Sequence, residues 1–183
     1  MVIGEKTRNI IFFCIIIIVI FTISVVATKD FDLSDYPKPF VKENVLISVI
    51  IVGENAKIGD MMGAIDIAAS LEPQFEPSII KLDTEIDSIK GKNIIVVGGP
   101  CVNTVAAEIM GWPQKCDQDF EPGKAKIKLF EDENFALLVA GYSVTDTTIA
   151  CKILSNYKDY NFNGSEIETA GTVLDDMIIK KIK

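Results

Sequence analysis

Three short apolar runs, each ended by a glycine-containing turn, recur along the chain. They read VLISVIIV at residues 45–52, NIIVV at 93–97 and FALLVA at 135–140. Nearly continuous apolar runs of this length, rich in β-branched residues, are typical of strands that are buried on both faces of a sheet. Apolar residues at helical spacing follow each turn. The pattern therefore predicts three β-α units.

The expected helices occupy residues 59–71, 103–110 and 145–154. Asn103 is a good N-cap for the second helix, because its side-chain oxygen can accept from free backbone N–H groups. Ser143 and Asp146 have the spacing of a capping box at the start of the third helix. Both helix starts thus carry a local signal in the sequence.

Further strands are expected at residues 78–82, at 125–130 and in the tail at 167–182. Residues 125–130, AKIKLF, alternate apolar residues with lysine, which predicts an edge or half-exposed strand. The acidic turn 131–134 would join it to the next strand as a hairpin. Residues 111–123 form a long irregular loop that contains the single tryptophan, Trp112. These elements predict an α/β fold, a three-layer sandwich with a mostly parallel central sheet.

Residues 10–27 form an uncharged apolar run of 18 positions. A helix of that length covers about 27 Å, close to the roughly 30 Å hydrocarbon core of a bilayer. Lys6 and Arg8 precede the run and acidic residues follow it, so the body of the protein is expected outside the membrane. A cleaved signal peptide is the alternative, and a buried helix of a cytosolic domain is a third, less favoured one.

The resulting domain organisation has four parts. Residues 1–9 form a cytoplasmic n-region, 10–27 the anchor or signal segment, 28–43 an extended linker, and 44–183 an extracellular α/β domain. The linker is expected because Pro37 and Pro39 disfavour a helix. The expected location is therefore the cell surface, or the medium if the N-terminal segment is cleaved.

Composition and charge narrow the chemistry further. The 183 residues include no histidine, which excludes Ser-His-Asp and Cys-His nucleophile pairs and imidazole metal sites. Without Glu5, Lys6 and Arg8, the chain has 16 basic and 25 acidic side chains of the total 18 and 26, a net charge of −9. Such a charge repels polyanions, so no nucleic-acid partner is expected.

The turns after the three buried strands are the default site, because ligands of open α/β sheets bind beyond the carboxyl ends of the strands. This candidate turn face comprises Gly53, Glu54, Asn55, Gly98, Gly99, Pro100, Asn103, Gly141, Tyr142 and Ser143. The turns contain neither GxGxxG nor GxxxxGK[ST], so they lack a phosphate-binding loop. No cofactor is expected.

Four carboxylates near these turns, Glu54, Asp60, Asp66 and Asp146, could in principle bind Ca²⁺ or Mg²⁺. The favoured interpretation is that they are solvated or cap helices, because Asp60 and Asp146 fall in a first helical turn, where an acid suits the helix dipole. No metal site is therefore predicted.

Four features of the sequence occur together in a fixed order: VGENAKIGDMMGAIDIA at 52–68, NIIVVGGPCVN at 93–103, the second loop cysteine Cys116, and FALLVAGYSVTDTTIACKIL at 135–154. Together they resemble the domain that recurs in archaeal S-layer proteins. The resemblance runs from DLSDYPKPFV onward and implies a non-catalytic structural module on the cell surface. Proteins that tile such a lattice are usually several times longer, which puts lattice formation by this chain alone in doubt.

Two of the four cysteines, Cys101 and Cys116, fall in loops of the part expected outside the cell, where disulfides persist. A disulfide between them is predicted, with free thiols or a reactive Cys101 as weaker alternatives. Cys14 and Cys151 occupy apolar positions and need no chemical role. Asn163-Gly164-Ser165 is a glycosylation sequon, although Asn-Gly is equally typical of a hairpin turn.

Two classes of function follow. The favoured one is a membrane-tethered, non-catalytic surface module whose partners are the membrane, through residues 10–27, and S-layer or other envelope proteins. The alternative is an extracellular small-ligand or sugar-binding domain, or an enzyme using carboxylates such as Glu54 and Asp146. A pocket of roughly 300 Å³ or more with converging carboxylates at the turns would favour the alternative.

Overall fold

The computed structural model describes residues 31–72, 79–170 and 178–181. These residues belong to a folded unit that begins at Phe31. The segments 1–9 and 10–27, and so the predicted anchor, lie outside the described residues. None of the helices that the structure describes is long and apolar enough to cross a membrane.

A mixed seven-stranded sheet forms the centre of the unit, in the order β4-β3-β5-β7-β6-β8-β9. The strands are β3 (Val49–Val52), β4 (Ile80–Leu82), β5 (Ile94–Val97), β6 (Lys124–Glu131), β7 (Phe135–Gly141), β8 (Glu166–Ala170) and β9 (Ile178–Lys181). The neighbours from β4 to β7 run parallel, and β6, β8 and β9 add antiparallel strands. The prediction of an α/β domain with a largely parallel sheet is confirmed.

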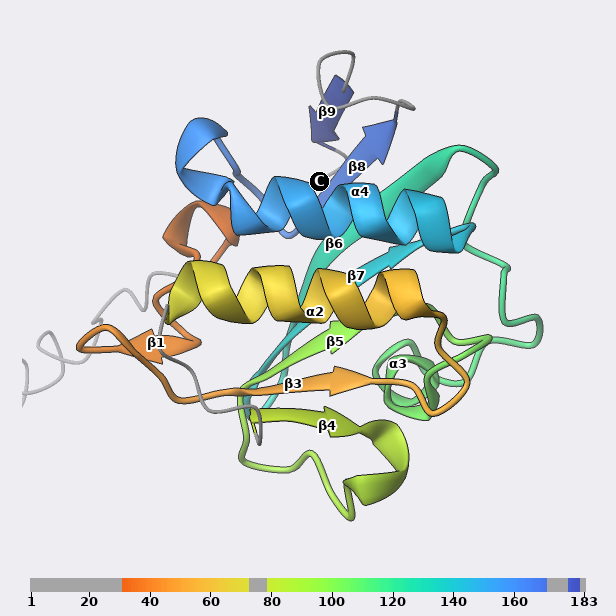
Figure 1. Cartoon of the computed structure of the whole chain (residues 1–183), viewed down its shortest axis with the longest axis horizontal. Coiled ribbons are helices and arrows are strands. Elements are labelled where there is room, and N and C mark those ends of the chain that lie inside the picture. The colour runs from red at the N-terminus through yellow and green to blue at the C-terminus, as the bar shows by residue number, and fades with distance from the viewer. Residues whose placement is uncertain (1–30, 73–78, 171–177, 182–183) are drawn as a thin grey trace, which may run out of the picture. The chain divides into compact units, whose positions relative to one another are not determined.

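Helices cover both faces of the parallel part of this sheet. On one face α2 (Ile58–Leu71) and α4 (Val144–Ser155) lie side by side over the strands (Figure 1). The short α3 (Thr104–Ile109) packs on the other face, where Val105 and Ala106 join the core with residues of β3, β5 and β7. Both helix–sheet contacts bury apolar side chains, and this burial is the main stabilising contribution to such layers.

The second and third predicted β-α units are confirmed at their positions, and so is the helix of the first unit. The runs at 93–97 and 135–140 form β5 and β7, whose inner residues are fully buried. The helices expected at 59–71, 103–110 and 145–154 are α2, α3 and α4, each within one residue of the expected start. The tail expected as one strand at 167–182 contains β8 and β9, with residues 171–177 between them outside the described part.

The run at 45–52 is two strands and not one. Residues Val45–Leu46 form β2, which pairs with β1 (Val41–Lys42) in a separate two-stranded sheet, and the main sheet begins only at Val49. The chain changes partner between them, because the backbone N–H of Ile47 and the hydroxyl of Ser48 both donate to the carbonyl of Phe40. Sequence alternation alone does not reveal that contact.

The strand β6, expected as an edge or half-exposed strand, lies between β7 and β8, so it is not an edge, and it is half-exposed. Its alternation is real, since the lysines face solvent and Ala125, Ile127 and Leu129 are buried. Lys126 and Lys128 form ion pairs with Glu166 of β8, at 3.1 and 2.8 Å. Burial favours the neutral form of Glu166, but the two lysines outweigh it and lower the pKa of Glu166. Lysines along β6 therefore reflect cross-strand pairing and not an edge.

The linker expected at 28–43 is part of the folded unit over residues 31–43. Leu33, Tyr36 and Phe40 are buried in the main core cluster, at 1%, 8% and 1% exposure. Asp32 and Leu33 also bond to Gly164, which lies beside β8. Pro37 and Pro39 suggested an extended segment, but the leucine and aromatic side chains before and after them are part of the core. The domain thus begins before residue 44.

Candidate functional site

The three glycine-containing turns lie at one edge of the sheet, as predicted. They follow β3, β5 and β7, which are parallel neighbours in the order β3-β5-β7. The carboxyl ends of parallel strands share one edge, so residues 53–55, 98–103 and 141–143 occupy the same end of the domain. This end is the candidate turn face.

A hollow of about 250 Å³ opens on the turn face. Its lining includes five of the predicted residues, Gly98, Gly99, Gly141, Tyr142 and Ser143. Lys57, Asp60, Asp117, Phe120 and both disulfide cysteines complete much of the wall. The other predicted residues, Gly53, Glu54, Asn55, Pro100 and Asn103, are not among those that line it.

Gly53 is where the first two turns touch. A Cβ at this position would lie 1.7 Å from the carbonyl oxygen of Val102 and 2.8 Å from the Cα of Asn103. Those atoms are backbone and cannot swing away, so only glycine fits. Gly53 therefore brings the turn after β3 against the turn after β5, and its role is packing.

Asn103 joins three elements through its side chain. Its Oδ1 accepts from the backbone of Val105 and Ala106 at 3.0 and 3.2 Å, so it is the N-cap of α3, as predicted. Its Nδ2 donates to the carbonyls of Ile51 and Val97 at the ends of β3 and β5, at 3.2 and 3.0 Å. Asn103 is 1% exposed. The amide of Asn103 thus donates two hydrogen bonds and accepts two, all with backbone groups of the domain.

Asp83 has a similar role that the sequence did not reveal. Its carboxylate accepts from the backbone of Glu54, at 2.7 Å, and from the backbone and hydroxyl of Thr104, at 2.7 and 2.9 Å. Burial favours the neutral carboxyl, but the hydrogen bonds from Thr104, Glu54 and Thr84 outweigh it and lower the pKa of Asp83. Asp83 thus fixes the turn after β3 to the first residue of α3.

The four candidate carboxylates do not converge. Asp60 accepts from the backbone N–H of Lys57, at 3.0 Å, and Asp146 accepts from the backbone and hydroxyl of Ser143, at 3.0 and 2.7 Å. Burial raises the pKa of Asp60, and the backbone hydrogen bond and charge of Lys57 offset part of that effect. In the part of the chain that the structure describes, no three Asp, Glu or Cys side chains are grouped to hold a metal ion. The capping interpretation accounts for Asp60 and Asp146.

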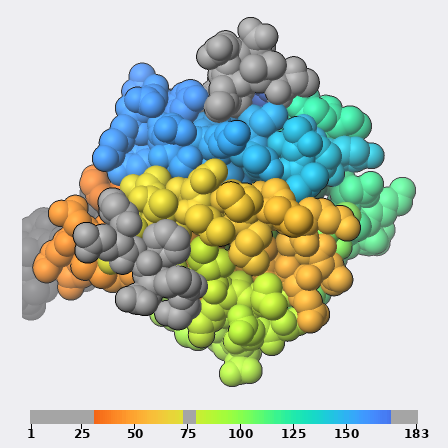
Figure 2. All heavy atoms as spheres, in the orientation of Figure 1, coloured from red at the N-terminus to blue at the C-terminus, as the bar shows by residue number. Residues whose placement is uncertain are grey.

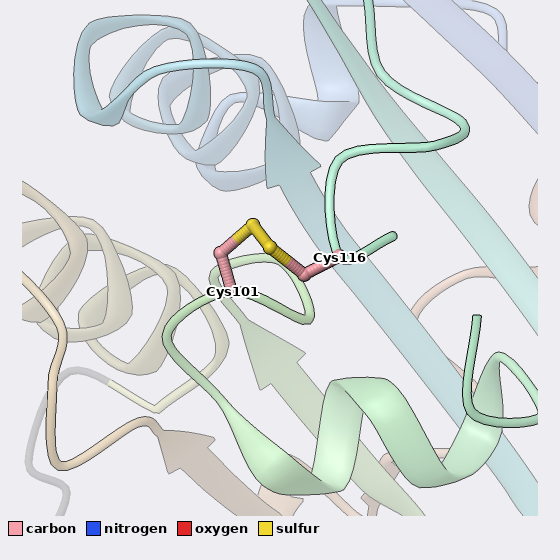
Figure 3. Close-up of a disulfide and its surroundings, with 2 residues drawn as sticks. All are labelled: Cys101 and Cys116. Carbon is pink, nitrogen blue, oxygen red and sulfur yellow. A yellow bond between two sulfur atoms is a disulfide. The ribbon is translucent and has the colours of Figure 1, made fainter. Parts of the chain in front are cut away.

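A disulfide joins Cys101 and Cys116 (Figure 3), and both cysteines line the hollow. Cys101 lies in the turn after β5, and Cys116 lies in the loop 111–123. Both residues are exposed. Phe120, from the same loop, is buried against Gly99 and the rest of the α3-side core. The disulfide and Phe120 together attach the loop to the turn face.

Cys151 is a free thiol, fully buried on α4 as the sequence predicts. Burial, with contributions from Asp60 and Asp66, raises the pKa of the Cys151 thiol. The side chain packs against Gly63 of α2, where a Cβ would come within 2.6 Å of its Sγ. This thiol is a packing residue.

The sequon residue Asn163 is exposed, in the connection between the 3-10 turn Tyr157–Asp159 and β8. It does not occupy a hairpin turn, so that alternative for Asn-Gly is wrong. Gly164 has a φ of +76° and donates its N–H to Asp32, which explains the glycine without a hairpin. An accessible sequon remains a predicted glycosylation site.

A second hollow, of about 440 Å³, lies near the β6–β7 hairpin. Its apolar wall includes Ile89, Ile109 and Phe130, and its acidic wall comprises Glu108, Glu131, Asp132 and Glu133. None of these residues was among the sequence-based candidates. The only local signal was the acidic turn 131–134, which is also what an ordinary solvated hairpin contains.

The chain matches no protein-family model, and a search of the curated proteins finds no match. Its class is therefore defined by its own fold and turn face: an α/β domain with a disulfide-bonded loop over the carboxyl ends of its parallel strands.

Proposed function

We propose that the protein is a membrane-tethered, non-catalytic module of the cell surface, similar to the domain of archaeal S-layer proteins, and that it contributes to envelope structure or surface contacts. The tether in this proposal is the apolar run at 10–27. The domain that follows it would lie outside the cell, with S-layer or other envelope proteins as partners.

The main observation behind the proposal is that polar side chains at the turn face hydrogen-bond to the backbone of the domain itself. Asp60, Asp83, Asn103 and Asp146 are all bonded to backbone groups that begin helices or join turns. A general acid–base pair needs two groups free to reach a substrate. Their engagement favours a scaffold over a catalytic centre.

The size of the turn-face hollow points the same way. At about 250 Å³ it is smaller than the roughly 300 Å³ at the lower end of ligand sites. Its lining includes the helix-capping Asp60 and the disulfide, and Glu54 and Asp146 are not part of it. A ligand site or a carboxylate-dependent active site at the turn face therefore has less support.

An exposed disulfide supports the location. Disulfides persist in oxidising compartments and are rare in the cytosol. Cys101 and Cys116 are both exposed, so their bond would meet cytosolic reductants directly. A position outside the cell, which is one of the oxidising environments, would keep this bond oxidised.

Helix α2 offers a surface for contacts. Ile58, Met62 and Ile65 are exposed at 83%, 51% and 36%, and Ala69 is exposed too. Their spacing places them along one side of α2, and α2 lies on the face of the domain toward the viewer in Figure 2. An apolar row of this kind on a surface helix is typical of protein–protein contact sites.

The test is the topology of the full chain in cells. We expect it to sediment with membranes and resist carbonate extraction, and externally added protease should degrade the domain on intact cells. A matched variant with Ile17→Lys and Ile18→Lys should lose membrane retention, because two charges in the run oppose insertion. Protection of the domain until the cells are lysed would overturn the proposal.

A further inference from the structure

A second group of exposed apolar side chains lies away from α2, at the hairpin formed by β1 and β2. Val45 and Ile47 are 52% and 56% exposed. Val45 lies in β2 and Ile47 directly follows it, and they alternate with the buried Leu46 and Ser48, so both side chains point away from the core. Phe31, at the start of the folded unit, is 37% exposed. We call Phe31, Val45 and Ile47 the hairpin-end patch.

A chain of contacts places the three residues at the same end of the domain. The Phe31 ring lies edge-on to the Phe135 ring at the start of β7, with centroids 5.0 Å apart. Asn93, just before β5, accepts from the backbone of Phe135 and donates to the carbonyl of Pro39. The next residue, Phe40, accepts from the backbone of Ile47. The patch thus lies at the amino ends of the parallel strands.

This end is where the chain enters from the apolar run. The run ends at Ala27 and the folded unit begins at Phe31. Four residue steps reach at most about 14 Å when fully extended. With no linker over 31–43, a bilayer that holds residues 10–27 must lie within that reach of Phe31.

We propose that the hairpin-end patch rests on the lipid bilayer, with Val45 and Ile47 at the boundary of headgroups and acyl chains. This inference rests on the proposed membrane tether. The tether keeps the patch close to the membrane, so even a weak insertion of a few apolar side chains is effective.

The charges around the patch define the lipid. Four lysines, Lys38, Lys42, Lys90 and Lys92, are exposed at this end, and so are four acidic residues, Glu43, Glu131, Asp132 and Glu133. This balance does not favour an anionic surface, where the acidic side chains would be repelled. The partner is therefore a bilayer with neutral headgroups, bound through apolar contact.

The docking would also orient the domain. The strand β7 has seven residues and runs from Phe135, near the patch, to Gly141 at the turn face. At about 3.3 Å per residue, the two ends are separated by about 20 Å. The turn face, its hollow and the disulfide would then point away from the membrane, toward the surroundings of the cell.

The experiment uses the full chain in phosphatidylcholine vesicles and two tryptophan reporters. Each is made in a Trp112→Phe background: Ile47→Trp in the patch, and Tyr142→Trp at the turn face, where Tyr142 is 48% exposed. We expect lipids brominated on the acyl chains to quench the reporter at position 47 at least twofold more than the one at 142. The reporter at 142 should remain open to aqueous iodide.

A second measurement uses no tryptophan reporter, because tryptophan is itself attracted to the membrane–water interface. Hydrogen exchange of the wild-type chain in vesicles should be slower at residues 42–47 than in the variant with Val45→Ser and Ile47→Ser. Equal bromolipid quenching at 47 and 142, stronger quenching at 142, or exchange unchanged by the serines would each overturn the docking. A chain that does not float with the vesicles would instead overturn the membrane tether, so the two failures are distinguishable.

Discussion

Single polar side chains hold the turn face together by bonding to backbone groups of different elements. Asp83 links the turn after β3 to α3, and Asn103 links α3 to β3 and β5. A buried donor or acceptor without its partner costs about 1 to 3 kcal/mol. The scaffold of this end therefore depends on a few side chains.

Replacing Asp83→Asn should lower the free energy of unfolding by about 2 kcal/mol at pH 7, because a carboxylate that accepts several hydrogen bonds is lost. The pKa of Asp83 is lowered in the folded state, so its stabilisation is present above the unfolded pKa, about 4, and is lost as the pH falls through the folded value. Urea unfolding at pH 7 and pH 3 measures both effects.

The matched control for Asp83 is the exposed Asp119. Asp119→Asn should change the stability by less than about 0.5 kcal/mol at either pH. The difference between wild type and Asp83→Asn should shrink at pH 3, whereas a difference that stays constant with pH would contradict a role for the charged carboxylate.

Two glycines of the turn face offer a paired test of close packing. Gly53→Ala should lower stability by about 3 kcal/mol or more, since its methyl group would meet the backbone of Val102 at 1.7 Å. Gly99→Ala should change it by less than about 1 kcal/mol, because its nearest neighbours, Phe120 and Ala140, lie at ordinary contact distances of 3.6 to 3.8 Å. Thermal unfolding of both variants distinguishes the two; similar melting temperatures would show that the turns can move apart.

The residues that sequence reasoning found are those whose partners are close in the chain. Asn103 bonds to residues two and three positions on, and Ser143 to a residue three positions on, so motif spacing reveals them. Asp83 bonds to residues 29 and 21 positions away. Only the fold brings those groups together, and no local pattern marks them.

At the scale of elements, the loop 111–123 is attached to the sheet by the disulfide between Cys101 and Cys116, which are 15 positions apart. The variant with Cys101→Ser and Cys116→Ser should lose about 3 kcal/mol of stability, because a loop of that length no longer restricts the unfolded chain. Urea unfolding measures the loss. Cys151→Ala, which leaves the disulfide intact, is the control for removing a cysteine.

The disulfide also predicts a thiol count. The chain has four cysteines, so the denatured but unreduced full chain should take up alkylating reagent at two of them, Cys14 and Cys151. Intact mass and peptide mapping identify the sites. Labelling of Cys101 and Cys116 without reductant would contradict the bond.

The hydrophobic pattern predicted best those strands whose position does not depend on one contact with a distant residue. The strands β5 and β7 are buried on both faces, and apolar composition alone identifies them. The division of 45–52 into β2 and β3 depends on contacts with Phe40, and the central place of β6 depends on Glu166. The residues of 45–52 and of β6 do not themselves indicate which distant residues they contact.

At the scale of the whole molecule, the first described residues are part of the core and not a tether. Phe40→Ala should lower the stability of the domain by about 3 to 5 kcal/mol, since Phe40 is 1% exposed and its removal leaves a cavity. Val45→Ala, at an exposed position, should cost less than about 1 kcal/mol. Chemical denaturation of the full chain in detergent micelles compares them; equal losses would restore the linker interpretation.

The bond between Asp32 and Gly164 has a consequence for the order of events during synthesis. These residues are 132 positions apart, and Leu33 donates its backbone N–H to the carbonyl of the same glycine. Residues 32 and 33 therefore cannot form these native hydrogen bonds until residue 164 has been synthesised. If the residues after the anchor cross a membrane in order along the chain, they would do so without this closure, and the domain would be completed only on the far side.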